Sequence, residues 1–338
     1  MCNRVTRLSD VARCRIAIAA VAALSCVFAL APDGGVAQAQ SYPERAVRII
    51  VPFPAGGTAD AIPRLIAQHL SKKWGQPVVI ENRTGAAGNI GAEAAYRAAP
   101  DGYTLMSTPP PPLVMNQSLY PFLQFDPAQF EPIVIMAEVP SGLLVNPDKI
   151  KATTLAELID FLKHNPGKIT AATQGNGTTS HLTSEMFQMM AKVKLQNIPY
   201  RGSAPALQGL VAGDVDLMFD NLGVSLPLVK AGKLRLLAVA SAKRLPSLPD
   251  TPAMAEMLYG FESVAWFAVA APPKTPKAIV KMVNADINDI LRDPDVKDRL
   301  AKLSAEVFGG SPEKASAYMK EEIARWAQVI KAANIKLQ

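Results

Sequence analysis

The feature that most constrains the fold is an alternation of short apolar runs with apolar residues at helical spacing. Residues 47–51 (Val-Arg-Ile-Ile-Val) form one such run. After a glycine-rich turn, apolar side chains recur every three or four residues at Ile62, Leu65, Ile66 and Leu70. Further strand-like runs lie at residues 78–80, 103–106, 168–172, 195–199, 215–219 and 234–240. Alternating strands and helices predict parallel sheets covered by helices, which is an α/β fold.

Residues 1–39 have the three-part pattern of a secretory signal peptide. Four arginines precede an apolar run at residues 16–30, and Ala37-Gln38-Ala39 offers a small-residue cleavage site. A membrane span needs about 20 apolar residues, more than this run supplies. A lipoprotein attachment at Cys26 is disfavoured because the apolar run continues past that cysteine. The sequence therefore predicts a signal peptide at 1–39 and a periplasmic protein.

Composition excludes several classes of function. All three cysteines (Cys2, Cys14 and Cys26) lie within the predicted signal, so the remainder has no disulfide, thiolate nucleophile or cysteine-bound metal. Of the net charge of +6, four arginines and two aspartates lie in residues 1–39, which leaves +4 for the rest. That charge is spread without a basic block, so we expect no nucleic-acid partner. The histidines lack zinc-site spacing, and we expect no metal and no cofactor.

Four predicted strand-to-helix joints share glycine with small or polar residues. They are Pro52–Asp60, Thr173–His181, Tyr200–Pro205 and Phe219–Gly223. The first amides of a helix lack internal partners and lie at the positive end of its dipole. A carboxylate or phosphate is their natural guest, and open α/β sheets bind ligands at this edge. The competing interpretation is that these glycines only make tight turns.

Several residues at these joints allow more than one role. His181 is either a ligand contact or a helix-start residue, and a catalytic base is disfavoured because Ser180-His181 has no orienting acid. Asp60 and Asp220 are either paired acids or helix-capping carboxylates. The run Pro109–Pro112 is either a polyproline II turn or part of a pocket rim. Gly85-Ala-Ala-Gly88-Asn-Ile-Gly91 lacks the dinucleotide spacing, which favours a structural turn with close helix packing.

Eight motifs in order carry a family resemblance that covers residues 41–338. They are Pro52–Asp60, Gly75–Arg83, Gly85–Ala92, Ala99–Leu105, Gly175–Gly177, Tyr200–Ala206, Asp216–Asn221 and Ala231–Val239. Together they resemble the Bug family, the extracytoplasmic solute receptors of tripartite tricarboxylate transporters.

The resemblance implies the fold class of a periplasmic binding protein of type II, or Venus flytrap. Two α/β lobes are then joined by a two-strand hinge, with crossings near Val139–Val145 and Glu262–Phe267. We accordingly expect lobe one at 41–140 plus 265–338, and lobe two at 141–264.

The resemblance also implies a set of ligand-binding residues and no catalytic ones. Backbone amides of Ala55, Gly56 and Gly57 would meet the ligand carboxylate, and Asp60 would order the loop or a water. The remaining contacts expected from the family pattern are Phe53, Thr108, Gly177, Thr178, Thr179, Ser180, His181, Gly202, Ser203, Ala204 and Asp220.

Three segments depart from the family pattern. Ile62-Pro63 places a proline where relatives continue the helix, and Leu222-Gly223-Val224 replaces a proline-containing stretch. We expect Pro63 to lie in the first helical turn, where proline is tolerated. Ser107–Pro112 replaces glycine, threonine and histidine, which predicts a distal pocket that is stiffer and poorer in donors.

The function implied is capture of a small carboxylic acid between the lobes and its delivery to membrane permease subunits, by a monomer that is not an enzyme. Two alternatives stay open. A ligand-sensing receptor acting on a signalling partner needs the same cleft. A periplasmic hydrolase using Ser180 or Asp220 is disfavoured because no nucleophile-elbow motif is present.

Overall fold

A computed structural model describes residues 42–337, and Pro43 onward forms one compact unit. The predicted signal peptide lies outside the described residues. The strands are β1 Val47–Val51, β2 Val78–Asn82, β3 Thr104–Thr108, β4 Glu131–Val145, β5 Thr170–Thr173, β6 Gln196–Pro199, β7 Leu217–Asn221, β8 Arg235–Val239, β9 Val264–Ala271 and β10 Glu306–Val307. Each of the seven strand-like runs identified between residues 47 and 240 contains or overlaps one of these strands.

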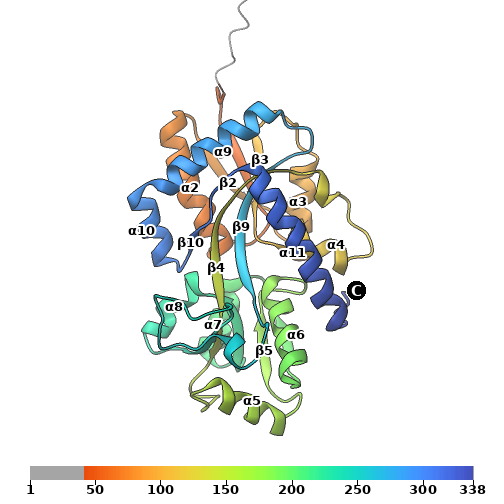
Figure 1. The fold of residues 1–338 in the computed structure, drawn as a ribbon, viewed down its shortest axis with the longest axis vertical. Coiled ribbons are helices and arrows are strands. Elements are labelled where there is room, and N and C mark those ends of the chain that lie inside the picture. The colour runs from red at the N-terminus through yellow and green to blue at the C-terminus, as the bar shows by residue number, and fades with distance from the viewer. Residues whose placement is uncertain (1–41, 338) are drawn as a thin grey trace, which may run out of the picture. The chain divides into compact units, whose positions relative to one another are not determined.

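Helices follow most strands, as the alternation predicts (Figure 1). The α-helices are α2 Thr58–Trp74, α3 Asn89–Tyr96, α4 Asn116–Leu119, α5 Leu155–His164, α6 Thr179–Ala191, α7 Ser203–Ala212, α8 Leu222–Lys230, α9 Lys277–Arg292, α10 Pro294–Lys302 and α11 Pro312–Ala332. Short helical turns are η2 Ala86–Gly88, η3 Pro111–Met115, η4 Pro127–Gln129 and η5 Met254–Glu256.

The strands pair in the order β2-β1-β3-β9-β4-β7-β5-β6, with β8 and β10 also pairing β4. Strands β1, β2 and β3 are parallel, and so are β5, β6 and β7. Every pairing of β4 and β9 is antiparallel. The expectation of parallel sheets is therefore wrong for β4 and β9, and also for β8 and β10, which pair with β4. The chain passes from the first set of strands along β4 and returns along β9 in the opposite direction.

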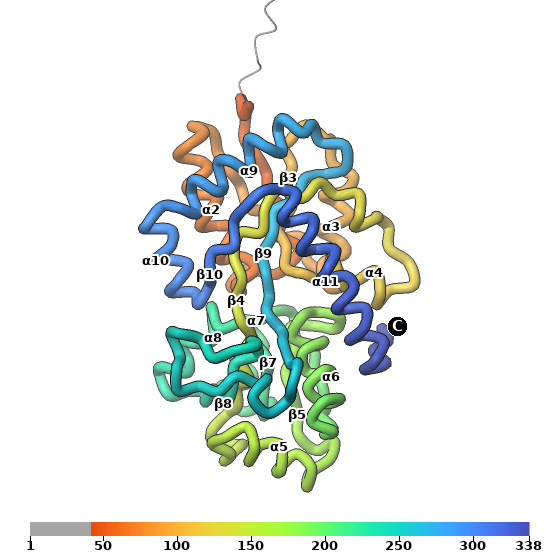
Figure 2. Tube along the Cα trace, viewed as in Figure 1, coloured from red at the N-terminus to blue at the C-terminus, as the bar shows by residue number. Residues whose placement is uncertain are grey.

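Strand β4 is the longest and changes partners along its length. Residues up to Pro140 pair with β9, whereas Ser141 to Val145 pair with β7 and β8. In both Figure 1 and Figure 2, β4 and β9 lie side by side between the two groups of helices. One continuous strand thus links the two parts of the sheet.

Separate apolar cores stabilise the two parts. The first gathers β1, β3, η3 and α11 around the fully buried Trp266 and Trp326. The second packs α5 and α6 against one face of the strands β5 and β7, around Phe187 and Phe219. A third packs α7 against the opposite face, around Leu144 and Met218. Helices on both faces of a sheet are the layered arrangement that an α/β sequence predicts.

Candidate ligand-binding site

The carboxyl ends of β1, β5 and β7 and the starts of α2, α6 and α7 meet around a small cavity, here called the inner cavity. Its volume is about 20 Å³, which is enough for roughly one water molecule. Its lining residues are Phe53, Pro54, Gly57, Thr58, Ala59, Pro109, Pro111, Gln174, Thr178, Thr179, Gly202, Ser203, Asn221 and Phe267. Residues far apart in the sequence therefore converge at one point.

The glycine loops before α2 and α7 lie in direct contact. A Cβ atom placed on Gly57 would lie 3.5 Å from the Cβ of Ser203, and one placed on Gly56 would lie 3.6 Å from the Cβ of Ala204. Gly56 has a φ of +88°, a conformation that favours glycine, whereas Gly57 has an ordinary extended φ of −95°. Gly57 is the N-cap of α2, so it begins the helix next to the cavity.

Asp60 orders the loop before α2. Its carboxylate accepts hydrogen bonds from the Gly56 amide (3.3 Å), Asn82 Nδ2 (2.9 Å) and Arg64 Nε (2.9 Å). Burial alone would raise the pKa of Asp60, but the hydrogen bonds from Arg64 and Asn82 outweigh it and hold this pKa below its usual value. Asp60 does not line the inner cavity, and its hydrogen bond from the Gly56 amide connects it to the loop that does.

Thr58 supplies an uncommitted hydroxyl. The residue is 2% exposed and lines the inner cavity, and its Oγ1 has no hydrogen-bond partner among the described residues. A buried polar atom without a partner costs stability unless a ligand or water satisfies it. The Thr58 hydroxyl is buried beside α8, since a Cβ placed on Gly223 would lie 3.0 Å from Thr58 Oγ1.

Asp220 lies behind the cavity and holds two residues that line it. The Ser203 hydroxyl donates to the Asp220 carboxyl at 3.0 Å, and Gln174 Nε2 also donates to it. The side chain is 1% exposed, and burial raises its pKa to about 7 despite those hydrogen bonds. Among the described residues no cation pairs with it, which distinguishes Asp220 from Asp60.

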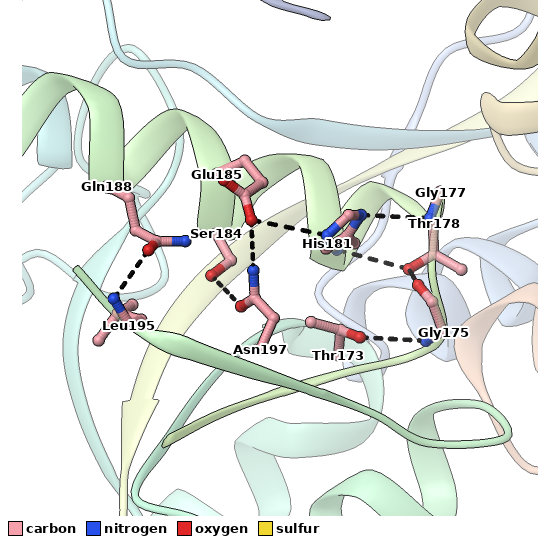
Figure 3. Close-up of polar contacts among 10 residues, drawn as sticks. All are labelled: Thr173, Gly175, Gly177, Thr178, His181, Ser184, Glu185, Gln188, Leu195 and Asn197. Carbon is pink, nitrogen blue, oxygen red and sulfur yellow. Dashed lines mark hydrogen bonds and ion pairs between the residues drawn. The ribbon is translucent and has the colours of Figure 1, made fainter. Parts of the chain in front are cut away.

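His181 is turned toward its own helix start (Figure 3). The Gly177 amide donates to His181 Nδ1 at 3.2 Å, so the neutral ring carries its proton on Nε2, which lies 3.6 Å from Glu185 Oε1. Burial lowers the pKa of His181. The Gly177 amide and the ring are thus hydrogen-bonded to each other within the loop that begins α6.

Ser180 and Thr108 are also committed to backbone carbonyls. The Ser180 hydroxyl donates to the Phe219 carbonyl at 2.6 Å, and the Thr108 hydroxyl donates to the Pro109 carbonyl at 3.0 Å. Both residues are buried. Each hydroxyl therefore uses its proton in a hydrogen bond to the backbone and does not offer it to a ligand in the inner cavity.

A second, larger space adjoins the inner cavity and is here called the outer cavity. Its volume is about 420 Å³. The two cavities share Phe53, Pro54, Gln174, Thr178 and Gly202. The outer cavity is further lined by Pro52, Thr84, Gly85, Ala86, Ala87, Gly88, Tyr120, Gly175, Asn176, Tyr200 and Arg201.

The structure brings some of the sequence-predicted site residues to the cavities and places others behind them. Those that line a cavity are Phe53, Gly57, Thr178, Thr179, Gly202 and Ser203. Those that line neither are Ala55, Gly56, Asp60, Thr108, Gly177, Ser180, His181, Ala204 and Asp220.

Sequence reasoning missed other lining residues. Thr58, Gln174 and Asn221 line the inner cavity and lie within the predicted strand-to-helix joints. The sequence thus predicted these joints as parts of the site, but it did not single out these three residues. Phe267 comes from the interior of β9, where no local signal marks a site.

Of the two alternatives for the proline run, the pocket rim agrees with the structure. Pro110 has φ −48° and ψ −41°, which is not a polyproline II conformation, and Pro109 and Pro111 line the inner cavity. One expectation about prolines is wrong. Pro63 lies in the second turn of α2, which begins at Thr58, and not in the first. Because proline has no N–H, the Ala59 carbonyl lacks its usual donor there.

The packing predicted for the Gly85–Gly91 segment is confirmed. A Cβ on Gly91 would lie 2.6 Å from the Arg83 carbonyl oxygen and 2.7 Å from Pro52 Cβ, so α3 approaches β1 as only glycine permits.

The family model of the tripartite tricarboxylate transporter family receptor, TctC, matches residues 62–335. The chain belongs to this family. A Bug protein of Bordetella pertussis, BugT, is 37% identical to this TctC receptor over 303 residues, which cover 89% of this chain and 93% of BugT. A protein encoded in the tcbD–tcbE intergenic region of Pseudomonas sp. strain P51 is 38% identical over 293 residues, covering 86% and 87% of the two chains.

Solved structures show the same relationship. The TctC receptor matches the R. palustris protein Rpa4515 with adipate at a TM-score of 0.85 and 39% identity, covering 88% of this chain and all of that one. It matches MatC from Rhodopseudomonas palustris with bound malate at a TM-score of 0.81 and 34% identity, covering 86% and 100%. It matches the periplasmic binding protein BugD at a TM-score of 0.83 and 36% identity, covering 88% and 100%. The chain is therefore a Bug-type solute-binding receptor with the fold of these proteins.

Between residues 42 and 337, no three His, Cys, Asp or Glu side chains cluster in a way that would hold a metal ion. Within the same range, no helix of the TctC receptor has the length and apolar character of a membrane span.

Proposed function

We propose that this receptor captures a small organic acid at the inner cavity by its carboxylate and delivers it to membrane permease subunits, without catalysing a reaction. The observation that carries the proposal is the convergence of three helix starts on one cavity, whose lining residues include Thr58. Helix-start amides and hydroxyls are suited to a carboxylate. Solved relatives that contain adipate and malate support the same class of ligand.

We further propose that the two parts of the fold are lobes that close on the ligand. Lobe one would comprise 41–140 plus 265–338, and lobe two 141–264. The change of β4 from β9 to β7 and β8 at Pro140 and Ser141 supports this division. Contact between the loops at Gly57 and Ser203 supports closure across the cavity, with β4 and β9 as the hinge.

The proposal includes the chain's location and assembly. Family membership and the signal-like pattern of residues 1–39 support export to the periplasm. We propose that the receptor acts as a monomer that has no nucleic-acid partner.

The hydrolase alternative gains no support from the site. Ser180 donates its hydroxyl to a backbone carbonyl, and His181 Nδ1 accepts from the Gly177 amide, so the two side chains do not form a nucleophile–base pair. A role in sensing would use the same ligand and the same cleft. A strain that lacks this receptor but still takes up the acid normally, and that no longer induces genes in response to the acid, would favour sensing.

The test is calorimetric titration of purified protein with adipate, malate and monocarboxylates. Gly57→Val keeps an allowed backbone conformation, but its methyl groups would meet Ser203, since a Cβ already lies 3.5 Å from the Ser203 Cβ. We expect affinity to fall by about tenfold or more, whereas the matched control Gly57→Ala stays close to the parent.

Thr58→Val provides a second variant that adds no bulk. It removes the unpaired hydroxyl, so we expect weaker carboxylate binding with an unchanged or higher unfolding midpoint. Unchanged affinity in both Gly57→Val and Thr58→Val would contradict carboxylate capture at the inner cavity.

A further inference from the structure

The long C-terminal helix α11 is fixed to lobe one at its middle. The indole N–H groups of Trp266 on β9 and Trp326 on α11 both donate to the buried Glu322 carboxylate, at 3.0 and 3.1 Å. The Tyr318 hydroxyl donates to Glu138 of β4 at 2.7 Å. From this anchored part α11 runs toward α6, which belongs to lobe two (Figure 1). The last turns of α11 and the residues after it therefore extend from one lobe toward the other.

Each lobe places an apolar side chain against the core of the other. Leu182 of α6 is fully buried in the first apolar core, and every other buried residue of that core within the described part of the chain lies in lobe one. In return, Val329 of α11 packs against the second core, whose buried residues all lie in lobe two. Val329 packs against the first core as well. The two lobes thus share an apolar contact at the end of α11.

The residues after α11 make a further contact with lobe two. A Cβ atom placed on Gly177, at the start of α6, would lie 2.7 Å from Leu337 Cδ1. It would also lie 3.2 Å from Ala87 Cβ and 3.4 Å from the Tyr120 hydroxyl oxygen, both of lobe one. Ala87 and Tyr120 line the outer cavity, whose walls include the loop before α6. This contact therefore lies between the lobes beside the outer cavity, and it would break when the lobes part.

The side chains of Leu182, Val329 and Leu337, here together called the latch, line neither the inner nor the outer cavity. Parting of the lobes would return the Leu182 side chain to water, which is unfavourable for apolar surface. The latch therefore stabilises the closed form whether or not a ligand is present. Because a ligand held by both lobes leaves only when they part, a stronger latch raises the affinity for any ligand.

We infer that Leu182, Val329 and Leu337 are positioning residues that set the affinity and the residence time of the ligand from outside the binding site, by holding lobe two against the end of α11. This inference rests on the proposed lobes and on the proposed capture of an acid between them. It adds residues remote from the cavities, and an equal effect on chemically different ligands, which the cavities do not specify.

The experiment compares dissociation rates in matched variants. Association and dissociation of adipate and of malate are followed by stopped-flow fluorescence in the parent chain, in Leu182→Ala and in Leu337→Ala. Two controls accompany them. Leu158→Ala removes an equally buried leucine inside the second core, and Lys336→Ala changes an exposed neighbour of Leu337. Melting curves give the stability of each variant, and the half-buried Leu337 keeps the test available should Leu182→Ala fail to fold.

We expect both acids to dissociate about tenfold faster from Leu182→Ala and about threefold faster from Leu337→Ala, with association rates within about twofold of the parent. A factor of ten corresponds to about 1.4 kcal/mol, close to the lower end of what burial of a leucine side chain contributes. Leu158→Ala lowers the melting temperature but leaves dissociation unchanged, because its lost contacts lie inside one lobe and are the same in both forms. Lys336→Ala changes neither quantity.

Three outcomes would overturn the inference, and the last differs in meaning. If the parent binds the acids but Leu182→Ala or Leu337→Ala releases them at the parent's rate, or if Leu158→Ala speeds release as much as Leu182→Ala does, the latch is wrong and capture stands. If release is faster for only one of the two acids, the variant acts on that ligand and not on closure, and the latch is again wrong. If the parent binds neither acid, capture at the inner cavity fails and the latch fails with it.

Discussion

At the scale of single residues, two aspartates near strand-to-helix joints, Asp60 in the first turn of α2 and Asp220 in β7, have opposite electrostatics. Asp60 is bound by Arg64 and Asn82, so its carboxylate is stabilised in the charged form. Asp220 is buried with neutral donors, Ser203 and Gln174, and burial raises its pKa to about 7. Both follow a strand in the sequence pattern, and only their three-dimensional neighbours distinguish them.

The Asp220 environment predicts a pH-dependent stability. The folded-state pKa of about 7 lies above the ordinary value of 3.8, so the folded protein binds a proton that the unfolded chain has lost. Stability from this group is therefore fully present below pH 4 and decreases as pH rises toward 7, by at most about 1.4 kcal/mol per pH unit.

Asp220→Asn mimics the neutral carboxyl and tests this prediction. We expect the variant and the parent to have similar unfolding free energies near pH 4, and the variant to be more stable at pH 8, in urea titrations without ligand. A difference between the two proteins that does not change with pH would contradict it.

At the scale of elements, the loop from β1 to α2 shows that adjacent glycines have different roles. Gly56 has a φ of +88°, and its amide donates to Asp60. Gly57 has an extended conformation and is the helix N-cap, so its small size matters only for the approach of Ser203. Backbone geometry therefore favours glycine at position 56, and the contact across the cavity limits position 57 to a small side chain.

We predict that Gly56→Ala and Gly57→Ala differ in stability. Alanine at position 56 enters a left-handed conformation and destabilises the fold by about 1–2 kcal/mol. Alanine at position 57 meets Ser203 at an ordinary contact distance of 3.5 Å and changes stability by less than about 0.5 kcal/mol. Unfolding midpoints in urea measure both, and equal losses would refute the distinction.

At the scale of the whole receptor, the loops at Gly57 and Ser203 belong to parts of the fold that are linked through β4 and β9. The distance of 3.5 Å from a Cβ on Gly57 to the Ser203 Cβ lies within the range that a disulfide spans. All three native cysteines precede residue 40, so an introduced pair has no competitor once the signal is removed.

The double variant Gly57→Cys with Ser203→Cys therefore tests closure. We expect it to oxidise readily and, once oxidised, to exchange bound adipate much more slowly than the reduced form, because the cleft is held shut. Reduction with dithiothreitol restores exchange, and each single-cysteine variant serves as a control. Exchange at the same rate in oxidised and reduced protein would show that closure does not gate the ligand.

The sequence by itself determined the alternation of strands and helices, the joints at which the cavities lie, and the family. These depend on local spacing, on glycine at turns such as Gly56, and on motifs that are contiguous in the chain. The tertiary structure decided which side chains face the ligand. Gln174 and Thr58 line the inner cavity while Ser180 and His181 turn away, because hydrogen-bond partners such as the Phe219 carbonyl come from strands distant in sequence. Likewise the antiparallel direction of β4 and β9, and the raised pKa of Asp220, arise from long-range pairing and burial, which no local pattern of residues encodes.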